Sequence, residues 1–334
     1  MTAGTHPREA LFDAGEAAPA LPVCDHYAGV EARMRKSLEL QAELGPVFDV
    51  TLDCEDGAPV GGEVEHAHLV AEIATSATNL HGRVGARALA FEHPRFSDVL
   101  DVLLGRAGAR LAYLMLPKPR DAAELARACD AVDAAAARCG LARRVPLHAL
   151  VETPGALRDV VAMAAHPRIE SLSFGLMDFV SAHRGAIPQA AMSATGQFEH
   201  PLVVRAKLEI AAACHAANKV PSHCVVTEFK DGKALQRAAE RACRQFGYTR
   251  MWSIHPSQVR TIVEAFAPTA AEVDLAIDIV NAAQSAGWAP IRHHDVLHDR
   301  ASYRYFWHVL ERARRTDQPL PAEVLERYFD VAPE

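Results

Sequence analysis

The chain has 334 residues and a hydrophobic content of 50%, so it can bury a large core, and α/β barrels commonly fill such a length as one domain. Its net charge of -7 and pI near 6.2 argue against a nucleic-acid partner, because phosphate binding needs clustered Lys and Arg. Seven cysteines without a C-x-x-C pair, no signal peptide and no apolar run of about 18 residues predict a cytoplasmic protein without disulfides, structural zinc or a membrane segment.

Short apolar runs alternate along the chain with longer Ala-rich stretches of helical period, which is typical of βαβ units and a parallel sheet. Strands are expected at residues 21–24, 48–52, 84–91, 111–116, 147–151, 171–174, 223–226 and 251–254. A helix is expected after each strand, at residues 29–44, 63–80, 97–107, 121–139, 154–165, 202–217, 232–246 and 256–266. Eight strands with eight following helices predict a closed (β/α)8 TIM barrel rather than an open doubly wound sheet.

The segments outside these eight units are expected to be appendages. Residues 1–19 are expected to form a loose N-terminal tail, and residues 20–268 the barrel. Residues 269–334 are expected to form a C-terminal helical extension, with helices near 270–286 and 300–315. This extension is a candidate to contact a neighbouring subunit.

Acidic residues follow several of the expected strands. Glu55 and Asp56 follow the second strand, Glu152 ends the fifth and Asp178 follows the sixth. The carboxyl ends of barrel strands face one common mouth, and two carboxylates with several waters make a normal Mg2+ site, so Glu152 and Asp178 are the candidate metal pair. The alternative is that each carboxylate caps the helix after it, and their convergence on one face of the barrel favours the metal site.

Two basic residues belong to the same set of strand ends. Arg87 lies among apolar residues of the third expected strand and needs an anionic partner there. A substrate carboxylate would supply a bidentate partner, and an internal ion pair with Asp53 or Glu55 is an equal alternative. Lys118 ends the fourth strand, where a charge-pairing role is favoured over a Schiff base.

Other short motifs give no support to rival chemistries. The chain has neither a G-x-G-x-x-G nor a G-x-x-x-x-G-K-[ST] run, so dinucleotide and P-loop interpretations lose support. His293, His294 and His298 lie beside Asp295 and Asp299, and we interpret this cluster as a solvated loop rather than a metal site.

Five short segments occur in a specific order and spacing. They are L-D-C-E-D-G-A at 52–58, L-P-K at 116–118, V-E-T-P-G at 151–155, F-G-L-M-D-F at 174–179 and S-I-H-P-S-Q-V at 253–259. Together they resemble the HpcH/HpaI aldolase and citrate lyase family over about residues 21–315. The I-H-P-S-Q element and the A-F-A-P run at 265–268 are especially similar to its citrate lyase β-subunit-like and malyl-CoA lyase-like branch.

The resemblance implies a role for each candidate residue. It implies Mg2+ (or Mn2+) held by Glu152 and Asp178, with Glu55 and Asp56 hydrogen-bonded to metal-bound waters. Arg87 would bind the carboxylate or carbonyl end of a small keto acid such as glyoxylate, oxaloacetate or pyruvate. Lys118 is placed beside the same substrate, and an acyl-CoA is the second candidate ligand.

In the acyl-CoA-using branch, an aspartate of the C-terminal extension enters the active site of a neighbouring subunit and handles the α-proton of the acyl group. Asp299, in the L-H-D-R segment at 297–300, resembles that residue and is the candidate acid/base. The resemblance therefore implies a homotrimer or a hexamer. The alternative is that Asp299 caps the helix that begins near Ala301.

These expectations combine into a Mg2+-dependent carbon–carbon lyase or aldolase that acts on a 3-hydroxy acid or its CoA thioester. Two alternatives stay open. One is a malyl-CoA-type thioesterase that uses the same barrel, and the other is a non-catalytic, complex-dependent subunit like the citrate lyase β-subunit.

Overall fold

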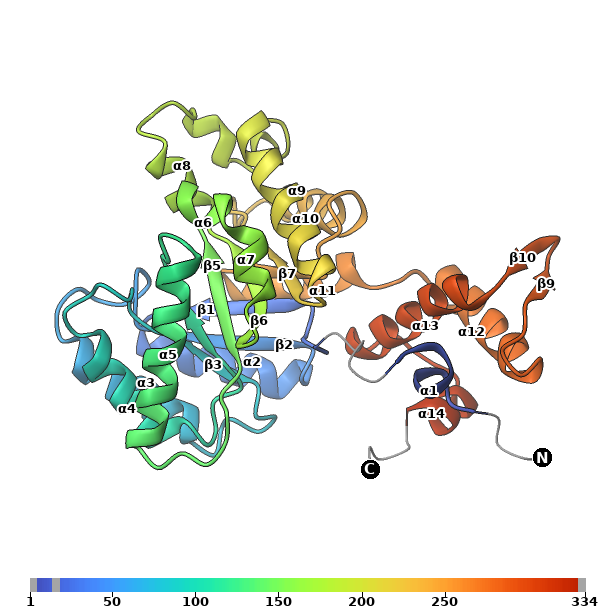
Figure 1. The fold of residues 1–334 in the computed structure, drawn as a ribbon, viewed down its shortest axis with the longest axis horizontal. Coiled ribbons are helices and arrows are strands. Elements are labelled where there is room, and N and C mark those ends of the chain that lie inside the picture. The colour runs from blue at the N-terminus through green and yellow to red at the C-terminus, as the bar shows by residue number, and fades with distance from the viewer. Residues whose placement is uncertain (1–4, 14–18, 330–334) are drawn as a thin grey trace. The chain divides into compact units, whose positions relative to one another are not determined.

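The computed structural model describes residues 5–13 and 19–329. The chain divides into two compact units, one spanning Pro19–Phe266 and one combining the segment before residue 19 with residues 267 onward (Figure 1). No described helix has both the length and the apolar content needed to span a membrane.

The unit Pro19–Phe266 is a closed barrel of eight parallel strands, as expected from the sequence. The strands are β1 (Cys24–Ala28), β2 (Phe48–Asp53), β3 (Val84–Arg87), β4 (Leu114–Leu116), β5 (Leu147–Val151), β6 (Ile169–Phe174), β7 (Val220–His223) and β8 (Arg250–Ser253). Each strand pairs in parallel with the next, and β1 closes the ring by pairing with β8 at Cys24 and Met251. The result is a TIM barrel.

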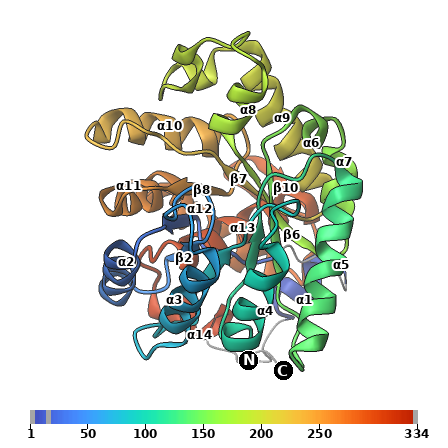
Figure 2. The same ribbon diagram turned by 90° about the vertical axis from the view of Figure 1, so that its left-hand side faces the viewer.

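Helices surround the ring of strands and cover its apolar outer surface (Figure 2). They are α2 (Glu31–Leu44), α3 (Glu63–Thr75), α4 (Phe96–Ala107), α5 (Ala122–Arg138), α6 (Pro154–Arg158), α7 (Val160–Ala165), α8 (Leu176–Ala182), α9 (Pro201–Ala216), α10 (Gly232–Arg244) and α11 (Pro256–Phe266). The helix expected at 154–165 is thus split into α6 and α7 at Asp159, and α8 with two 3-10 turns, η1 (Gln189–Met192) and η2 (Gly196–Phe198), precedes α9.

Two of the predicted strands are shifted along the chain from the strands of the structure. The first strand is β1 at 24–28 instead of 21–24, and the seventh is β7 at 220–223 instead of 223–226. Both true strands contain buried polar residues, among them Asp25 and His26 in β1 and Ser222 and His223 in β7. A search for apolar runs passes over such strands, because it assumes that a barrel interior is apolar.

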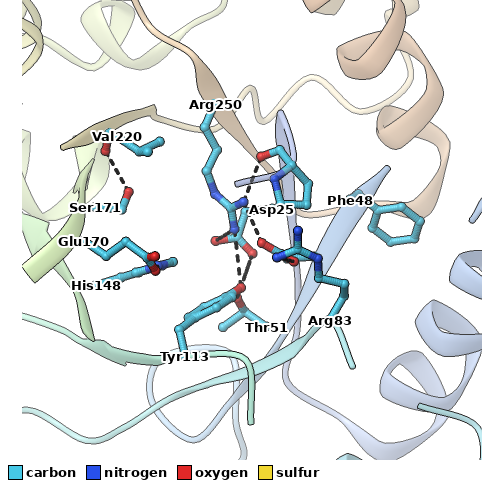
Figure 3. Close-up of polar contacts among 12 residues, drawn as sticks. Asp25, Phe48, Thr51, Arg83, Tyr113, His148, Glu170, Ser171, Val220 and Arg250 are labelled. Carbon is cyan, nitrogen blue, oxygen red and sulfur yellow. Dashed lines mark hydrogen bonds and ion pairs between the residues drawn. The ribbon is translucent and has the colours of Figure 1, made fainter. Parts of the chain in front are cut away.

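The interior of the barrel contains a charged network near the amino-terminal ends of the strands (Figure 3). Arg250, which has no exposed surface, places Nη1 2.6 Å from Asp49 Oδ2 and Nη2 3.1 Å from Asp25 Oδ2. Thr51 and Tyr113 donate hydrogen bonds of 2.7 Å and 2.9 Å to Asp25 Oδ1. Two buried carboxylates therefore share one buried guanidinium.

Aromatic stacking extends this network across the barrel. The Tyr113 ring stacks on His148 with the ring centroids 4.0 Å apart, and His148 Nε2 lies 3.0 Å from Glu170 Oε2. Gly85 makes room for Tyr113, since a Cβ at this position would lie 2.4 Å from its ring. Tyr27, two residues beyond Asp25, stacks on Trp252 with centroids 4.3 Å apart and forms the next layer toward the mouth.

The second unit is a small helical body with its own core. It contains α1 (Pro7–Leu11), α12 (Ala270–Ser285), β9 (Ile291–His293), β10 (Val296–His298), α13 (Arg300–Arg315) and α14 (Ala322–Tyr328). Within the stretch expected to be a loose tail, residues 7–11 form α1, and Leu11 is fully buried in this core. The histidine cluster near 293 forms an antiparallel hairpin whose turn residues, His294 and Asp295, both have positive φ.

Candidate active site

The charged residues expected at the mouth are delivered there by five consecutive strands. Glu55 and Asp56 lie in the loop after β2, and Arg87 is the last residue of β3. Lys118 lies two residues after β4, and Glu152 directly follows β5. Asp178 lies in the first turn of α8, after β6. All are at carboxyl ends of strands, so they share one face of the barrel.

Arg87 is buried and paired with acidic residues at the end of β2 and in the loop that follows it. Its Nε lies 2.7 Å from Asp53 Oδ1, its Nη2 contacts Asp53 Oδ2, and its Nη1 lies 3.2 Å from Glu55 Oε2. The guanidinium also lies over the Tyr27 ring, 5.4 Å from the centroid. The internal ion pair considered from the sequence is therefore formed with both acids.

Asp53 shapes the acidic loop as well as holding Arg87. Its carboxylate accepts backbone hydrogen bonds from Glu55 at 2.9 Å and from Gly57 at 2.8 Å. A Cβ on Gly57 would lie 2.3 Å from Asp53 Oδ2, and a Cβ on Gly29 would lie 1.8 Å from the Gly57 carbonyl oxygen. Two glycines thus allow the loops after β1 and β2 to meet.

Lys118 lies among three carboxylates. Its Nζ is 2.6 Å from Glu55 Oε1, 2.7 Å from Asp56 Oδ2 and 3.7 Å from Asp178 Oδ1. Burial by itself lowers the pKa of Lys118, but the hydrogen bonds to Asp56 and Glu55 outweigh it and raise the pKa above its ordinary value. Such a lysine stays protonated, which disfavours a Schiff-base role, since that chemistry needs a neutral amine.

Glu152 is the buried carboxyl of the site. Glu152 is 2% exposed, and its Oε1 accepts a 2.6 Å hydrogen bond from the Lys118 backbone N–H. Burial raises the pKa of Glu152 to about 8, and the negative charge of Asp178 adds to the increase. The two carboxyls expected to form the metal pair are therefore near enough to interact electrostatically.

The other two acids respond differently to the same surroundings. Burial raises the pKa of Glu55 above its ordinary value in spite of Arg87 and Lys118. For Asp56, burial acts in the same direction, but the hydrogen bond from Lys118 outweighs it and lowers the pKa. Asp56 is thus the more firmly ionised of the pair.

The donor set fits a small hard cation. Glu152 and Asp178 offer two carboxylates at one mouth, which with waters satisfies Mg2+. Lys118 lies near both carboxylates, since its backbone N–H donates to Glu152 and its Nζ lies 3.7 Å from Asp178 Oδ1. No group of three or more His, Cys, Asp or Glu side chains is arranged as a metal site in residues 5–13 and 19–329, so waters would complete the coordination shell.

The position of Glu152 depends on Gly175, the residue before α8. A Cβ at Gly175 would lie 2.5 Å from Glu152 Cβ and 2.4 Å from its Oε2. We expect Gly175→Ala to weaken Mg2+ binding by about 10- to 100-fold, because it displaces a carboxylate without removing it. Isothermal titration calorimetry would measure the change.

Gly232→Ala is the matched control, since a Cβ there meets nothing within 4 Å. Equal Mg2+ affinity in the Gly175 and Gly232 variants would mean that Glu152 does not bind the metal.

The I-H-P-S-Q segment supports the mouth instead of lining the charge cluster. Gln258, which is 1% exposed, accepts a 2.9 Å hydrogen bond from the Ile254 backbone and donates one of 2.8 Å to the Val226 carbonyl. It thereby ties the loop after β8 to the segment after β7. His255 stacks on Phe229, with centroids 5.1 Å apart, at the same edge.

Asp299 lies in the helical unit, where it caps α13. Its Oδ1 accepts hydrogen bonds from Ala301 N at 3.0 Å and Ser302 N at 3.4 Å. The Ser302 hydroxyl accepts one of 3.1 Å from the Asp299 backbone, which completes a capping box. The capping role considered from the sequence is therefore present.

Sequence reasoning missed two features of this site. Tyr27 lies beneath the Arg87 guanidinium, but the misplaced first strand ended before Tyr27. The second is the pair of hydrogen bonds that Asp53 accepts from the Glu55 and Gly57 backbones, because the sequence indicated Asp53 only as a possible partner of Arg87.

Known proteins are similar to this chain in sequence and in fold. The family model described as HpcH/HpaI aldolase/citrate lyase matches residues 49–256. An L-malyl-CoA/beta-methylmalyl-CoA lyase of Rhodobacter capsulatus is 27% identical over 204 residues, which is 57% of this chain and 62% of that enzyme. A (3S)-malyl-CoA thioesterase of Cereibacter sphaeroides is 29% identical over 175 residues, 51% of this chain and 53% of the enzyme.

Solved structures extend the likeness to nearly the whole chain. A citrate lyase from Burkholderia xenovorans LB400 is 53% identical, with a TM-score of 0.84 over 97% of this chain and 99% of that one. The protein CitE from Mycobacterium tuberculosis, in complex with magnesium, acetoacetate and coenzyme A, is 20% identical. Its TM-score is 0.67 over 88% of this chain and 99% of that one, a likeness in fold.

Proposed function

Because the chain belongs to the HpcH/HpaI aldolase/citrate lyase family, we propose that it is a carbon–carbon lyase that uses Mg2+ or Mn2+. Its substrate would be a 3-hydroxy acid or the CoA thioester of one, which it cleaves to a small keto acid and an acyl product or forms by the reverse condensation. The observation that carries the proposal is that Glu152 and Asp178 meet at the barrel mouth, where the Lys118 backbone lies 2.6 Å from Glu152 and its Nζ 3.7 Å from Asp178.

Glu152 and Asp178 would hold the ion, and Glu55 and Asp56 would accept hydrogen bonds from its waters. A bound divalent ion would act as a Lewis acid on the keto-acid oxygen where negative charge develops. Arg87 already contacts Asp53 and Glu55, so it would bind a substrate carboxylate with its remaining N–H groups. The contacts of the guanidinium with Tyr27 and Asp53 would hold it in place for this task.

Asp299 is proposed to supply the acid/base group for the acyl α-carbon from a neighbouring subunit, in a homotrimer or hexamer. Both hydrogen bonds that its side chain accepts in the capping box use Oδ1, which is compatible with proton transfer at Oδ2. A crystal grown with Mg2+ and a keto acid would show which subunit contributes Asp299.

The test is an assay of the purified chain with Mg2+ and malyl-CoA, citramalyl-CoA and citryl-CoA. Release of a keto acid together with a shortened acyl-CoA supports the lyase. Release of free CoA with the carbon skeleton intact supports a thioesterase instead, a second candidate that the likeness to the Cereibacter thioesterase favours. Keto-acid binding without any turnover would support a complex-dependent subunit and contradict the lyase.

Metal binding is expected to depend on pH through Glu152. Its pKa of about 8 means that the carboxyl must lose a proton before it can bind an ion at neutral pH. The apparent Mg2+ affinity should therefore rise about tenfold per pH unit below 8 and level off above it. Calorimetric titrations from pH 6 to 9 would measure this, and a flat profile would contradict the assignment.

A further inference from the structure

Lys118 occupies the centre of the acidic mouth with its own positive charge. We propose that Lys118 is a built-in counter-cation that competes with the divalent ion for the mouth carboxylates and so sets the metal affinity of the site. This inference rests on the proposed metal site at Glu152 and Asp178. It assigns to Lys118 a positioning and regulatory role that substrate binding alone does not require.

The ammonium contacts both kinds of acid in the site. It is 2.6 Å from Glu55 and 2.7 Å from Asp56, the residues proposed to bind the waters of the metal ion. It is also 3.7 Å from Asp178, a proposed ligand. One lysine thus neutralises part of the repulsion among these carboxylates.

The backbone of Lys118 directs the side chain into the mouth. Lys118 has a φ of 52°, a left-handed conformation that is uncommon for a residue with a side chain. It lies between Pro117 and Pro119, whose rings restrict the chain on both sides. Its N–H donates to Glu152 Oε1 at 2.6 Å, and the Pro119 carbonyl accepts a 3.2 Å hydrogen bond from Thr153.

No other described cation can take over this neutralising role at the mouth. Arg87 directs two of its three guanidinium nitrogens to Asp53, and only Nη1 reaches Glu55. Asp56 and Asp178 have ion pairs with Lys118 alone among residues 5–13 and 19–329. The Lys118 side chain is 29% exposed, so it can swing toward solvent when a stronger cation arrives.

Charge removal at Lys118 should therefore tighten metal binding. A divalent ion between Glu152 and Asp178 is repelled by an ammonium a few ångströms away, and an uncharged side chain removes this repulsion. We expect Lys118→Met to increase the Mn2+ association constant at least about tenfold, as the Coulomb interaction at a partly exposed site suggests. Lys118→Arg, which keeps the charge, should bind Mn2+ as the unaltered protein does.

The experiment is a Mn2+ titration of the full chain, followed by electron paramagnetic resonance, with Glu152→Gln and Lys233→Met as controls. Lys233 is exposed on α10, so its loss should leave Mn2+ affinity unchanged. If the unaltered protein does not bind Mn2+, the proposed function fails together with this inference. If it binds Mn2+ and Glu152→Gln does not, but Lys118→Met binds no more tightly, only the inference on Lys118 is overturned.

A second measurement covers the case in which Lys118→Met fails to fold. The chain has six lysines, so reductive methylation with 13C-formaldehyde gives a simple NMR spectrum in which the missing signal of Lys118→Arg identifies Lys118. Titration of Mg2+ should move the Lys118 signal and leave that of Lys36, on α2, in place. A stationary Lys118 signal during saturation with Mg2+ would overturn the inference.

Discussion

Glu152→Gln is expected to abolish Mg2+ binding and to lower lyase activity at least about a thousandfold, since a bound metal contributes several kcal/mol to stabilising the developing charge. Glutamine keeps the shape of the side chain and can still accept the hydrogen bond from the Lys118 backbone. It lacks the negative charge that an ion requires. Calorimetry with Mg2+ and a turnover assay with malyl-CoA and its homologues would measure the two losses.

The same variant should fold at least as well as the unaltered protein. The folded-state pKa of Glu152, about 8, lies above the usual value of a glutamate, so the folded protein binds more protons than the unfolded chain between those two values. The stability contributed by this group is therefore lost as the pH rises toward 8, and a neutral glutamine removes that loss. Glu264→Gln, at an exposed position of α11, is the control for activity.

Full activity of Glu152→Gln would refute the metal role of this carboxyl. A large fall in its melting temperature, in contrast, would show that Glu152 is needed for folding. The metal site would then be tested with Asp178→Asn, which changes the other proposed ligand.

Arg250→Met is expected to lower the free energy of unfolding of the barrel by about 3–5 kcal/mol, because it leaves buried carboxylates without a counter-ion. Asp25 and Asp49 have no exposed surface, and Arg250 contacts both. Arg83 reaches Asp49 only at 3.8 Å, so it cannot replace Arg250. Urea unfolding followed by circular dichroism would measure the loss.

Two controls separate charge from packing at this position. Adding Asp25→Asn and Asp49→Asn to Arg250→Met should recover much of the lost stability, since the uncompensated charges are then gone. Arg260→Met, at a surface pair with Glu43, should change stability by no more than about 1 kcal/mol. A loss from Arg250→Met as small as that from Arg260→Met would mean that the buried carboxylates are neutral in the folded protein.

The sequence was sufficient to predict the barrel because most of its strands are short apolar runs. The runs at 48–52, 147–151 and 251–254 coincide closely with β2, β5 and β8. It was insufficient for β1 and β7, since buried polar side chains interrupt the apolar pattern of both strands. Asp25 finds its counter-ion 225 residues away, at Arg250, and no local pattern signals such a pair.

The rule that strand ends meet at one mouth placed the candidate charged residues on a common face. It could not determine which charges pair, because side-chain direction depends on details of the backbone. The left-handed conformation of Lys118 brings its ammonium among three carboxylates, and nothing in L-P-K-P demands that conformation. The two-point contact between Arg87 and Asp53 likewise follows from the register of β2 and β3, which places Asp53 opposite Arg87.

The two groups of charges in this barrel differ in their access to water. The Arg250 network is shielded from solvent, whereas the side chains of Lys118 and Asp178 are 29% and 41% exposed. Dissolved ions screen the second group far more than the first. Raising the ionic strength from 0.05 to 0.5 M therefore weakens the ion pairs of Lys118 at the mouth. The buried ion pairs of Arg250 inside the barrel are affected much less.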